Sequence, residues 1–313
     1  MSTSGWTSAD IPDQRGRTAV VTGANSGVGF ETARMLAERG ARVVLACRNL
    51  DKATVACDAI RVTAPDAELH TTRLDLASTE SVHEAAATIG TDFDQIDLLI
   101  NNAGAAFGTR TLIDGTEQTF VTNQLGPFAF TGLLLRHVLA APAGRIVTVS
   151  SGSHEVGRLD LDDLAYAQRR YGRWRAYTQS KLANLLFTFE LQHRLAAAEE
   201  RAIAVAAHPG AAATEFGHNA GGFTRTMSAP PLRRLLAPLV STAAQGALPV
   251  LRAAVDPDVR GGEFYGPDGF HGIKGLPQRV QPAEAAQDTA ASAKLWEKCE
   301  QLTGVRYPLP SRH

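Results

Sequence analysis

The sequence predicts a doubly wound α/β fold, in which one mostly parallel sheet carries helices on both faces. Short apolar runs alternate with amphipathic stretches of helix length along most of the chain. The runs are apolar almost throughout, as strands buried on both faces must be. The stretches between them are long enough for the helical crossovers that parallel pairing needs. We expect a single domain over residues 17–313, preceded by an extension over residues 1–16.

Each expected element has a recognisable beginning or end. Gly40 ends the first helix, Asp51 is placed to cap the second, and Ser78 to cap the third. The expected strands cover residues 18–22, 42–47, 69–74, 97–101, 145–150, 203–208 and 263–265. The expected helices include residues 27–39, 78–89, 116–139 and 172–195. Ligands bind such sheets beyond the carboxyl ends of the strands, so functional residues should directly follow strands.

Composition and charge exclude several classes of function. The formal net charge is −1, which gives no electrostatic basis for binding nucleic acid or an anionic membrane. The three cysteines, Cys47, Cys57 and Cys299, form no C-x-x-C pair, so we expect neither a disulfide framework nor a zinc site. They favour a reducing compartment, and we predict a cytoplasmic protein. The uncharged runs 118–135 and 235–251 are too interrupted by polar residues and prolines for a membrane-spanning helix.

A glycine-rich turn follows the first strand. Gly23 permits a tight turn, Gly27 lets the backbone approach a pyrophosphate, and Gly29 lets the helix pack closely against the strand. The helix N-terminus then offers N–H groups and a partial positive charge to phosphates. The expected cofactor-binding residues of this turn are Gly23, Asn25, Ser26, Gly27, Val28 and Gly29.

The end of the second strand bears on the choice of cofactor. NAD-binding folds place an acidic residue there to accept hydrogen bonds from the ribose hydroxyls. Here Arg48 follows the strand and no acid is present. A guanidinium can pair with the 2′-phosphate of NADP, so we predict NADP(H). A solvated surface arginine is the alternative interpretation of Arg48.

Tyr177 and Lys181 stand four residues apart, one turn along the same face of a predicted helix. Hydride transfer to a carbonyl builds negative charge on oxygen, so a proton donor must lie within hydrogen-bond reach. A nearby ammonium favours the phenolate form of a tyrosine, which makes the phenol a usable acid and base. Tyr171 has Arg175 where this lysine should be, so we expect Tyr171 at the mouth of the pocket and not as the catalyst.

Together these motifs resemble those of the short-chain dehydrogenase/reductase family, from residue 17 to about residue 266. The resemblance is carried by Thr22–Gly29, Asp75, Asn101-Asn102-Ala103-Gly104, Asn123, Ser151, Tyr177-x-x-x-Lys181 and Pro209-Gly210. It implies a Rossmann-type fold and an NADP(H)-dependent oxidoreductase. It also implies a catalytic set made of Asn123, Ser151, Tyr177 and Lys181.

The resemblance implies a role for each member of this set. Tyr177 is the acid/base, and Lys181 also binds the nicotinamide ribose. Ser151 holds the substrate oxygen, and Asn123 holds a water that links Lys181 to solvent. From the residues alone, Ser151 could instead cap a helix and Asn123 could face solvent.

The resemblance implies further cofactor contacts after later strands. Asp75 and Leu76 border the adenine, although Asp75 could instead cap the helix near Ser78. The remaining expected contacts are Asn102, Ala103 and Gly104 at the adenine ribose, and Pro209, Gly210 and Thr214 at the nicotinamide carboxamide. Without the resemblance, both of these segments would be ordinary turns.

Residues 152–176 form a long segment between Ser151 and Tyr177. Together with 46–49, 177–184 and 208–210, this segment is similar to the retinol dehydrogenase and protochlorophyllide reductase branch, which acts on bulky apolar carbonyls or alcohols. Many members of that branch carry an N-terminal membrane anchor, and we expect none here because residues 1–13 are polar. Residues 214–240 are rich in glycine and proline, so we hypothesise a flap over an apolar small-molecule substrate, with a packed surface loop as the alternative.

Three functions stay open from the sequence. The first is a carbonyl reductase or alcohol dehydrogenase, which the complete catalytic set favours. The second is a non-catalytic NADP(H)-binding regulatory protein, and the third is a reductase of enone carbon–carbon double bonds. His154 and His208 lack metal-ligand spacing, so we interpret both as structural and expect no metal. The resemblance suggests a homodimer or homotetramer formed through the two long helices.

Overall fold

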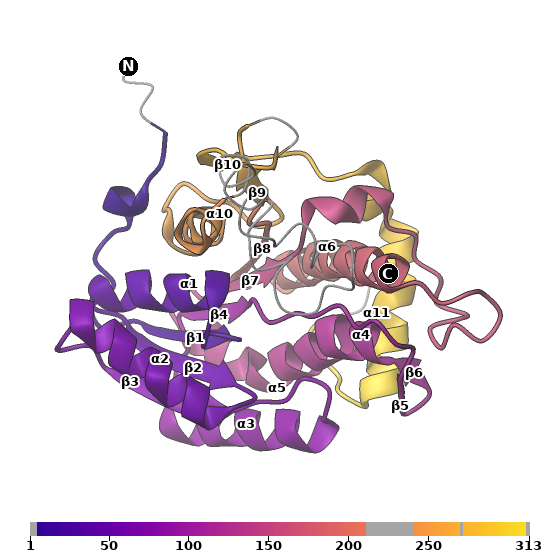
Figure 1. Ribbon diagram of the computed structural model, residues 1–313, viewed down its shortest axis with the longest axis horizontal. Coiled ribbons are helices and arrows are strands. Elements are labelled where there is room, and N and C mark those ends of the chain that lie inside the picture. Colours follow the sequence, from indigo (N-terminus) through magenta and orange to yellow (C-terminus); the bar gives the residue numbers. More distant parts are fainter. Residues whose placement is uncertain (1–4, 211–240, 270–271, 311–313) are drawn as a thin grey trace, which may run out of the picture.

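The structure is a computed structural model that describes residues 5–210, 241–269 and 272–310. Its centre is an eight-stranded sheet in the order β10-β9-β8-β7-β4-β1-β2-β3 (Figure 1). All neighbouring strands of this sheet are parallel except β9 and β10. The strands are β1 Thr18–Thr22, β2 Arg42–Cys47, β3 Leu69–Arg73, β4 Leu98–Asn101, β7 Arg145–Val149, β8 Ile203–Ala207, β9 Phe264–Pro267 and β10 Pro277–Arg279. The Rossmann-type doubly wound sheet that the sequence predicts is therefore confirmed.

Helices cover both faces of the sheet and create two separate cores (Figure 1). The helices of one face are α1 Gly27–Glu38, α2 Leu50–Thr63 and α10 Ala243–Val255, and those of the other are α3 Thr79–Asp92, α5 Gly126–Ala140, α6 Arg173–Ala197 and α11 Thr289–Thr303. Strand residues alternate between the two cores. Ala19 and Val21 of β1 belong to the first core and Val20 to the second, and all three side chains are fully buried. This double burial explains why the strands are apolar throughout.

Strand β1 lies between β2 and β4, so the chain winds outward from it in both directions. Helices that follow β1 and β4 therefore leave toward opposite faces, and a crevice opens between the carboxyl ends of these two strands. None of the helices in the described residues is long and apolar enough to cross a membrane.

The chain over residues 116–139 differs from the single helix that the sequence predicts. A hairpin of β5 (Leu112–Ile113) and β6 (Thr116–Glu117) comes first, followed by α4 (Gln118–Phe120), a π-helical segment (Val121–Leu125) and α5. Pro127 has no N–H group, so the carbonyl of Asn123 lacks its α-helical donor. The Asn184 Nδ2 of α6 donates to that carbonyl instead, at 2.7 Å. A proline and a neighbouring helix thus stabilise the π-helical turn, a feature that is frequent at functional sites.

Two helix caps test the predicted boundaries. Ser78 caps α3 as expected, because its hydroxyl accepts from the Ser81 N–H at 3.2 Å. The predicted cap at Asp51 is wrong: Asn49 caps α2, and its Oδ1 accepts from the Lys52 N–H at 2.9 Å. Asp51 already lies inside the first turn of the helix.

Helix α11, absent from the predicted elements, packs against α5 and α6 (Figure 1). Its Trp296 is 1% exposed and meets the rings of Phe128 and Tyr307 at centroid distances of 5.1 and 4.5 Å. The guanidinium of Arg194, in α6, lies 4.4 Å from the centroid of the Trp296 ring. Helix α11 thus covers part of the surface of α5 and α6. The homodimer or homotetramer stays a prediction.

Candidate active site

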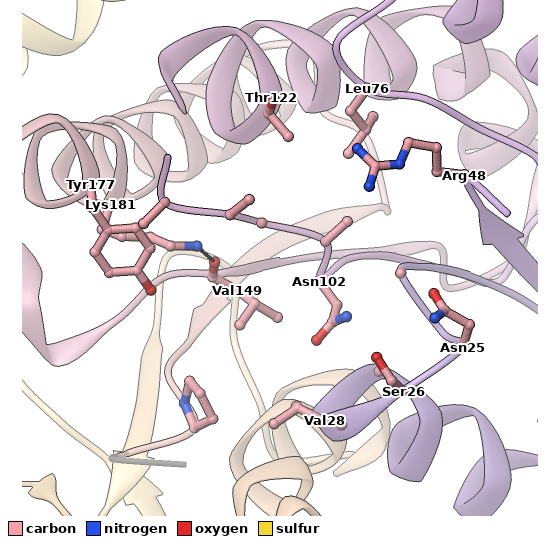
Figure 2. Close-up of a pocket in the computed structure, with 18 of the residues that line it drawn as sticks. Asn25, Ser26, Val28, Arg48, Leu76, Asn102, Thr122, Val149, Tyr177 and Lys181 are labelled. Atoms are coloured by element: carbon pink, nitrogen blue, oxygen red, sulfur yellow. Dashed lines mark hydrogen bonds between the residues drawn. The ribbon is translucent and has the colours of Figure 1, made fainter. Parts of the chain in front are cut away.

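A cavity of about 650 Å³ lies at the carboxyl ends of the parallel strands (Figure 2). Six strands each contribute a residue just after their end: Gly23 after β1, Arg48 after β2, Leu74 after β3, Asn102 after β4, Ser150 after β7 and Pro209, two residues after β8. Motifs that are far apart in the sequence therefore meet at one edge of the sheet, as parallel strand order requires.

The glycine-rich turn forms one wall of the cavity, to which Gly23, Asn25, Ser26, Gly27, Val28 and Gly29 all contribute. Gly23 and Gly27 have φ values of 67° and 59°, a region that favours glycine. A Cβ on Gly29 would lie 2.6 Å from the Gly23 carbonyl oxygen, so only glycine permits this close approach of helix and strand. Because the first N–H groups of α1 have no intrahelical acceptor, this wall fits a phosphate group.

Thr22 ties the glycine-rich turn to the turn after β4. Its fully buried hydroxyl accepts from the N–H groups of Asn102 and Ala103, at 3.0 and 2.9 Å. Asn102 Nδ2 in turn donates to the Thr22 carbonyl at 2.9 Å. The Asn102 side chain therefore connects the backbone after β4 to the backbone at the end of β1. Asn102, Ala103 and Gly104 line the middle of the cavity.

Arg48 lies at one end of the cavity, with Leu76 and Asn25 close by (Figure 2). Its side chain is exposed, and Asp75 lines the cavity as well. The Asp75 carboxylate accepts from the Ala77 N–H at 3.0 Å, so it supports the turn before α3 while Ser78 caps the helix. Burial raises the pKa of the nearby Cys47 thiol to about 11, so this end of the cavity contains no thiolate at neutral pH.

Tyr177 and Lys181 lie side by side at the opposite end of the cavity (Figure 2). Both belong to α6, and both are buried, with 8% and 4% of their surfaces exposed. The Lys181 ammonium donates to the Val149 carbonyl at 2.9 Å and lies 5.6 Å from the centroid of the Tyr177 ring. The backbone of β7 thus holds the ammonium beside the phenol, where its charge favours the phenolate.

Asn123 is buried in the π-helical segment and does not face solvent. Its amide accepts from the Ala105 N–H and donates to the Ala105 carbonyl, both at 2.8 Å, and it also donates to Ser180 Oγ at 2.9 Å. Thr122 rather than Asn123 lines the cavity. A Cβ on Gly104 would nevertheless lie 3.3 Å from Lys181 Nζ and 3.4 Å from Asn123 Oδ1, so the two polar groups converge on Gly104.

Ser150 and Ser151, directly after β7, make different contacts. Ser150 lines the cavity, and its Oγ donates to the Lys181 carbonyl at 2.8 Å. Ser151 caps the 3-10 helix Gly152–Val156 by accepting from the Ser153 N–H at 3.2 Å. The capping alternative for Ser151 is therefore realised, although a hydroxyl that accepts one hydrogen bond can still donate another.

The two histidines near the site support backbone, as the structural interpretation expects. His154 Nδ1 contacts the Ser151 carbonyl at 2.8 Å, and its Nε2 accepts from the Ala283 N–H at 3.1 Å. Burial lowers the pKa of His154, and it lowers the pKa of His208 to about 4. Both imidazoles are therefore neutral near pH 7. No group of three metal-binding side chains occurs in the described part of the chain.

The last predicted cofactor segment is only partly described. Pro209 lines the cavity, and Gly210 adopts a φ of 72°, where a Cβ would lie 2.5 Å from the Ile273 carbonyl oxygen. Thr214 and the predicted flap over residues 214–240 lie outside the described residues.

Comparison with known proteins assigns the chain to a family. The family model for short chain dehydrogenases matches residues 17–222. Human retinol dehydrogenase 13 is 38% identical over 303 residues, which cover 96% of this chain and 87% of that protein. The chain belongs to the short chain dehydrogenase family. Within it, the chain lies in the retinol dehydrogenase-like branch, as the resemblance of its motifs implies.

Three further proteins are similar to this chain. Human dehydrogenase/reductase SDR family member 13 is 38% identical over 301 residues, covering 93% of this chain and 74% of that protein. A crystal structure of a protein from Mycobacterium paratuberculosis is 40% identical, with a TM-score of 0.80 and coverage of 98% of this chain and 100% of that one. A short chain dehydrogenase from Shigella flexneri is 22% identical with a TM-score of 0.63, covering 82% and 98%, and shows the shared fold.

Several cavity residues of this short chain dehydrogenase were absent from the predicted set. They are Ala46, Leu74, Ala105, Ala106, Phe107, Thr122, Val149, Ser150, Arg173 and Trp174. Most are small or apolar, and their types alone carry no chemical signal. Trp174 could have been found, because a bulky aromatic residue three positions before Tyr177 lies on the same helix face. Tyr171, expected at the mouth of the pocket, instead donates to the Phe107 carbonyl at 2.7 Å and so supports the wall.

Proposed function

We propose that this oxidoreductase transfers a hydride between NADP(H) and the carbonyl or alcohol carbon of an apolar small molecule, with Tyr177 as its acid/base. The observation that carries the proposal is the buried pair of Tyr177 and Lys181, which faces the cavity at the end opposite Arg48. A proton donor and a phosphate-binding cation thus occupy the two ends of one cavity, about 650 Å³ in volume.

The residues present fit a nicotinamide dinucleotide. The glycine-rich turn would hold the pyrophosphate, because Gly29 leaves room beside the free N–H groups of α1. Arg48 would pair with the 2′-phosphate, and Asp75 and Leu76 would border the adenine. The remaining proposed contacts are Asn102, Ala103 and Gly104 at the adenine ribose, Lys181 at the nicotinamide ribose, and Pro209, Gly210 and Thr214 at the carboxamide. Bound there, the nicotinamide supplies or accepts the hydride.

The chain supplies the proton that balances the hydride. In the reducing direction Tyr177 Oη donates its proton to the carbonyl oxygen, which forms the alcohol. In the oxidising direction the phenolate takes that proton back. The Lys181 ammonium stabilises the phenolate, and the Val149 carbonyl holds it in place. Asn123 Oδ1 and Lys181 Nζ both face Gly104, which suits a relay that returns protons from solvent.

Ser151 is proposed to donate its hydroxyl proton to the substrate oxygen beside Tyr177. Its Oγ already accepts from the Ser153 N–H, which orients the lone pairs and leaves the proton available. His154 contacts the Ser151 carbonyl and so keeps this backbone in register. A second donor of this kind stabilises the charge that develops on the substrate oxygen.

An apolar substrate agrees with the wall of the cavity that neighbours Tyr177. Ala105, Ala106, Phe107, Val149 and Trp174 supply mostly hydrocarbon surface there. The names of the relatives, retinol dehydrogenases among them, point to an alcohol and carbonyl couple of apolar character.

The test is the NADPH-dependent reduction of a panel of aldehydes and ketones, with identification of the products. Tyr177→Phe should lower kcat by about 10²–10⁴-fold, the usual contribution of a general acid, while the dissociation constant for NADPH stays unchanged. Tyr265→Phe is the matched control, since its hydroxyl donates to Glu263 away from the cavity. Undiminished turnover by Tyr177→Phe would refute the mechanism, and a saturated ketone formed from an enone would indicate a double-bond reductase.

A further inference from the structure

Trp174 is an exposed aromatic side chain at the cavity. It lies in the first turn of α6 and is 58% exposed. Among the large apolar side chains that are exposed in the described residues, it is the one aromatic residue; the others are leucine, isoleucine and valine. Its ring is stacked on that of Tyr177, at a centroid distance of 5.8 Å and an interplanar angle of 29°.

This arrangement is not explained by packing alone. More than half of the Trp174 indole is exposed to water. A ligand that covered this apolar surface would therefore be stabilised in its bound state. The indole is stacked on the Tyr177 ring and lines the cavity, so it adds exposed aromatic surface beside Tyr177. Aromatic side chains prefer offset partners, and a planar ligand can supply one.

The surrounding chain holds this wall in place. Tyr171, three residues before Trp174, donates its hydroxyl proton to the carbonyl of Phe107, which lines the cavity together with Trp174 and Tyr177. The Tyr171 ring meets the Tyr166 ring edge to face at 5.4 Å, and the guanidinium of Arg169 lies 4.2 Å from the Tyr166 centroid. The long segment before Tyr177 therefore ends in an ordered aromatic cluster.

We infer that Trp174 is a specificity-determining residue, and that the substrates it selects are planar, aromatic or conjugated carbonyl compounds and the corresponding alcohols. The flat face of such a substrate lies on the exposed indole while its oxygen reaches Tyr177 Oη. This inference rests on the proposed hydride transfer, which it deepens by naming the shape of the substrate. A saturated, puckered ring of the same size cannot make the same face-to-face contact.

Two aldehydes with one carbon skeleton test the inference: planar naphthalene-2-carbaldehyde and its saturated analogue decahydronaphthalene-2-carbaldehyde. We expect Trp174→Ala to lower kcat/KM for the planar aldehyde about 10-fold, mostly through a higher KM, because a stacked aromatic contact is lost. The saturated aldehyde should change less than about twofold. Trp174→Phe, which keeps a flat ring, should restore most of the preference for the planar aldehyde. Val156→Ala is the matched control, because Val156 is 65% exposed but does not line the cavity.

The other outcomes contradict the inference in distinct ways. Equal losses on both aldehydes would mean that Trp174 supports Tyr177 and does not select substrates. Unchanged kinetics on both would mean that the indole makes no substrate contact. In either case, turnover by the wild-type protein still supports the proposed hydride transfer. If the wild-type protein reduces other carbonyl compounds but neither of these aldehydes, the inference is contradicted and the proposed function is not. No turnover of any carbonyl compound in the panel would contradict the proposed function, and this inference with it.

Discussion

The hydroxyl of Thr22 offers a quantitative test of how β1 organises the cavity. It is fully buried and accepts two backbone N–H groups, from Asn102 and Ala103. Valine has the same shape but no acceptor, so Thr22→Val leaves the Ala103 N–H unpaired, while the Asn102 N–H keeps its second acceptor, the Ile100 carbonyl at 3.0 Å. An unpaired buried donor costs about 1–3 kcal/mol. Because Ala103 is only half-buried, we take the lower end and expect a loss of about 1 kcal/mol in the free energy of unfolding.

Thr148 in β7 provides a matched control with the opposite expected sign. Its hydroxyl is also buried, but it has no hydrogen-bond partner among the described residues. Thr148→Val removes an unsatisfied polar group, so we expect it to leave the free energy of unfolding unchanged or to raise it by up to about 1 kcal/mol.

Urea denaturation of both variants measures these free energies, provided that the slope of the transition stays constant. Titration with NADPH measures the second consequence, since the Asn102 turn that Thr22 holds lines the cavity. We expect weaker NADPH binding for Thr22→Val and unchanged binding for Thr148→Val. Equal changes in stability for the two variants would refute the argument that the hydrogen bonds of Thr22, and not its shape, hold the turn.

Three further predictions concern other parts of the molecule. Arg48→Asp should raise the KM for NADPH about tenfold, because a charge-assisted hydrogen bond is lost, and should improve turnover with NADH. Arg73→Asp is the control, since Arg73 ends the neighbouring strand but lies outside the cavity. It should change neither the KM for NADPH nor the turnover with NADH. Burial and nearby His154 keep the folded-state pKa of His208 at about 4, whereas the unfolded chain protonates a histidine near 6.5. The unfolded state then binds more protons between these values, so the free energy of unfolding should fall as the pH drops from about 6.5 to 4, and His208→Gln should flatten that slope in urea titrations at each pH. Trp296→Ala should cost about 3–5 kcal/mol in unfolding free energy, because it empties a fully buried site, whereas exposed Trp174→Ala should cost less than about 1 kcal/mol.

The strands could be predicted because each carries its own signal. Residues 18–22 and 42–47 are apolar at every central position, and their observed bounds match the predicted ones. Parallel strands bring their carboxyl ends to one edge, so the order of the motifs also predicts which of them meet. The glycine-rich turn, Arg48, Tyr177 and Lys181 line one cavity as a result.

The errors lie where a distant partner competes with local preference. The helix expected over residues 116–139 begins with a hairpin and a π-helical turn, because Pro127 removes a donor and Asn184 replaces it from another helix. The cap expected at Asp51 falls to Asn49, two residues earlier, since either type of side chain can accept the first N–H groups. Helix α11 lacked any motif, and only its packing against α5 and α6 shows its role.

The sequence by itself determined the order of seven strands of the central sheet along the chain and the family, because local periodicity and motif spacing encode these properties. Only the tertiary structure decided which of two neighbouring side chains faces the cavity. Thr122 lines it while Asn123 holds Ala105. The direction of a side chain depends on contacts with residues far away in the sequence, and no local pattern contains them.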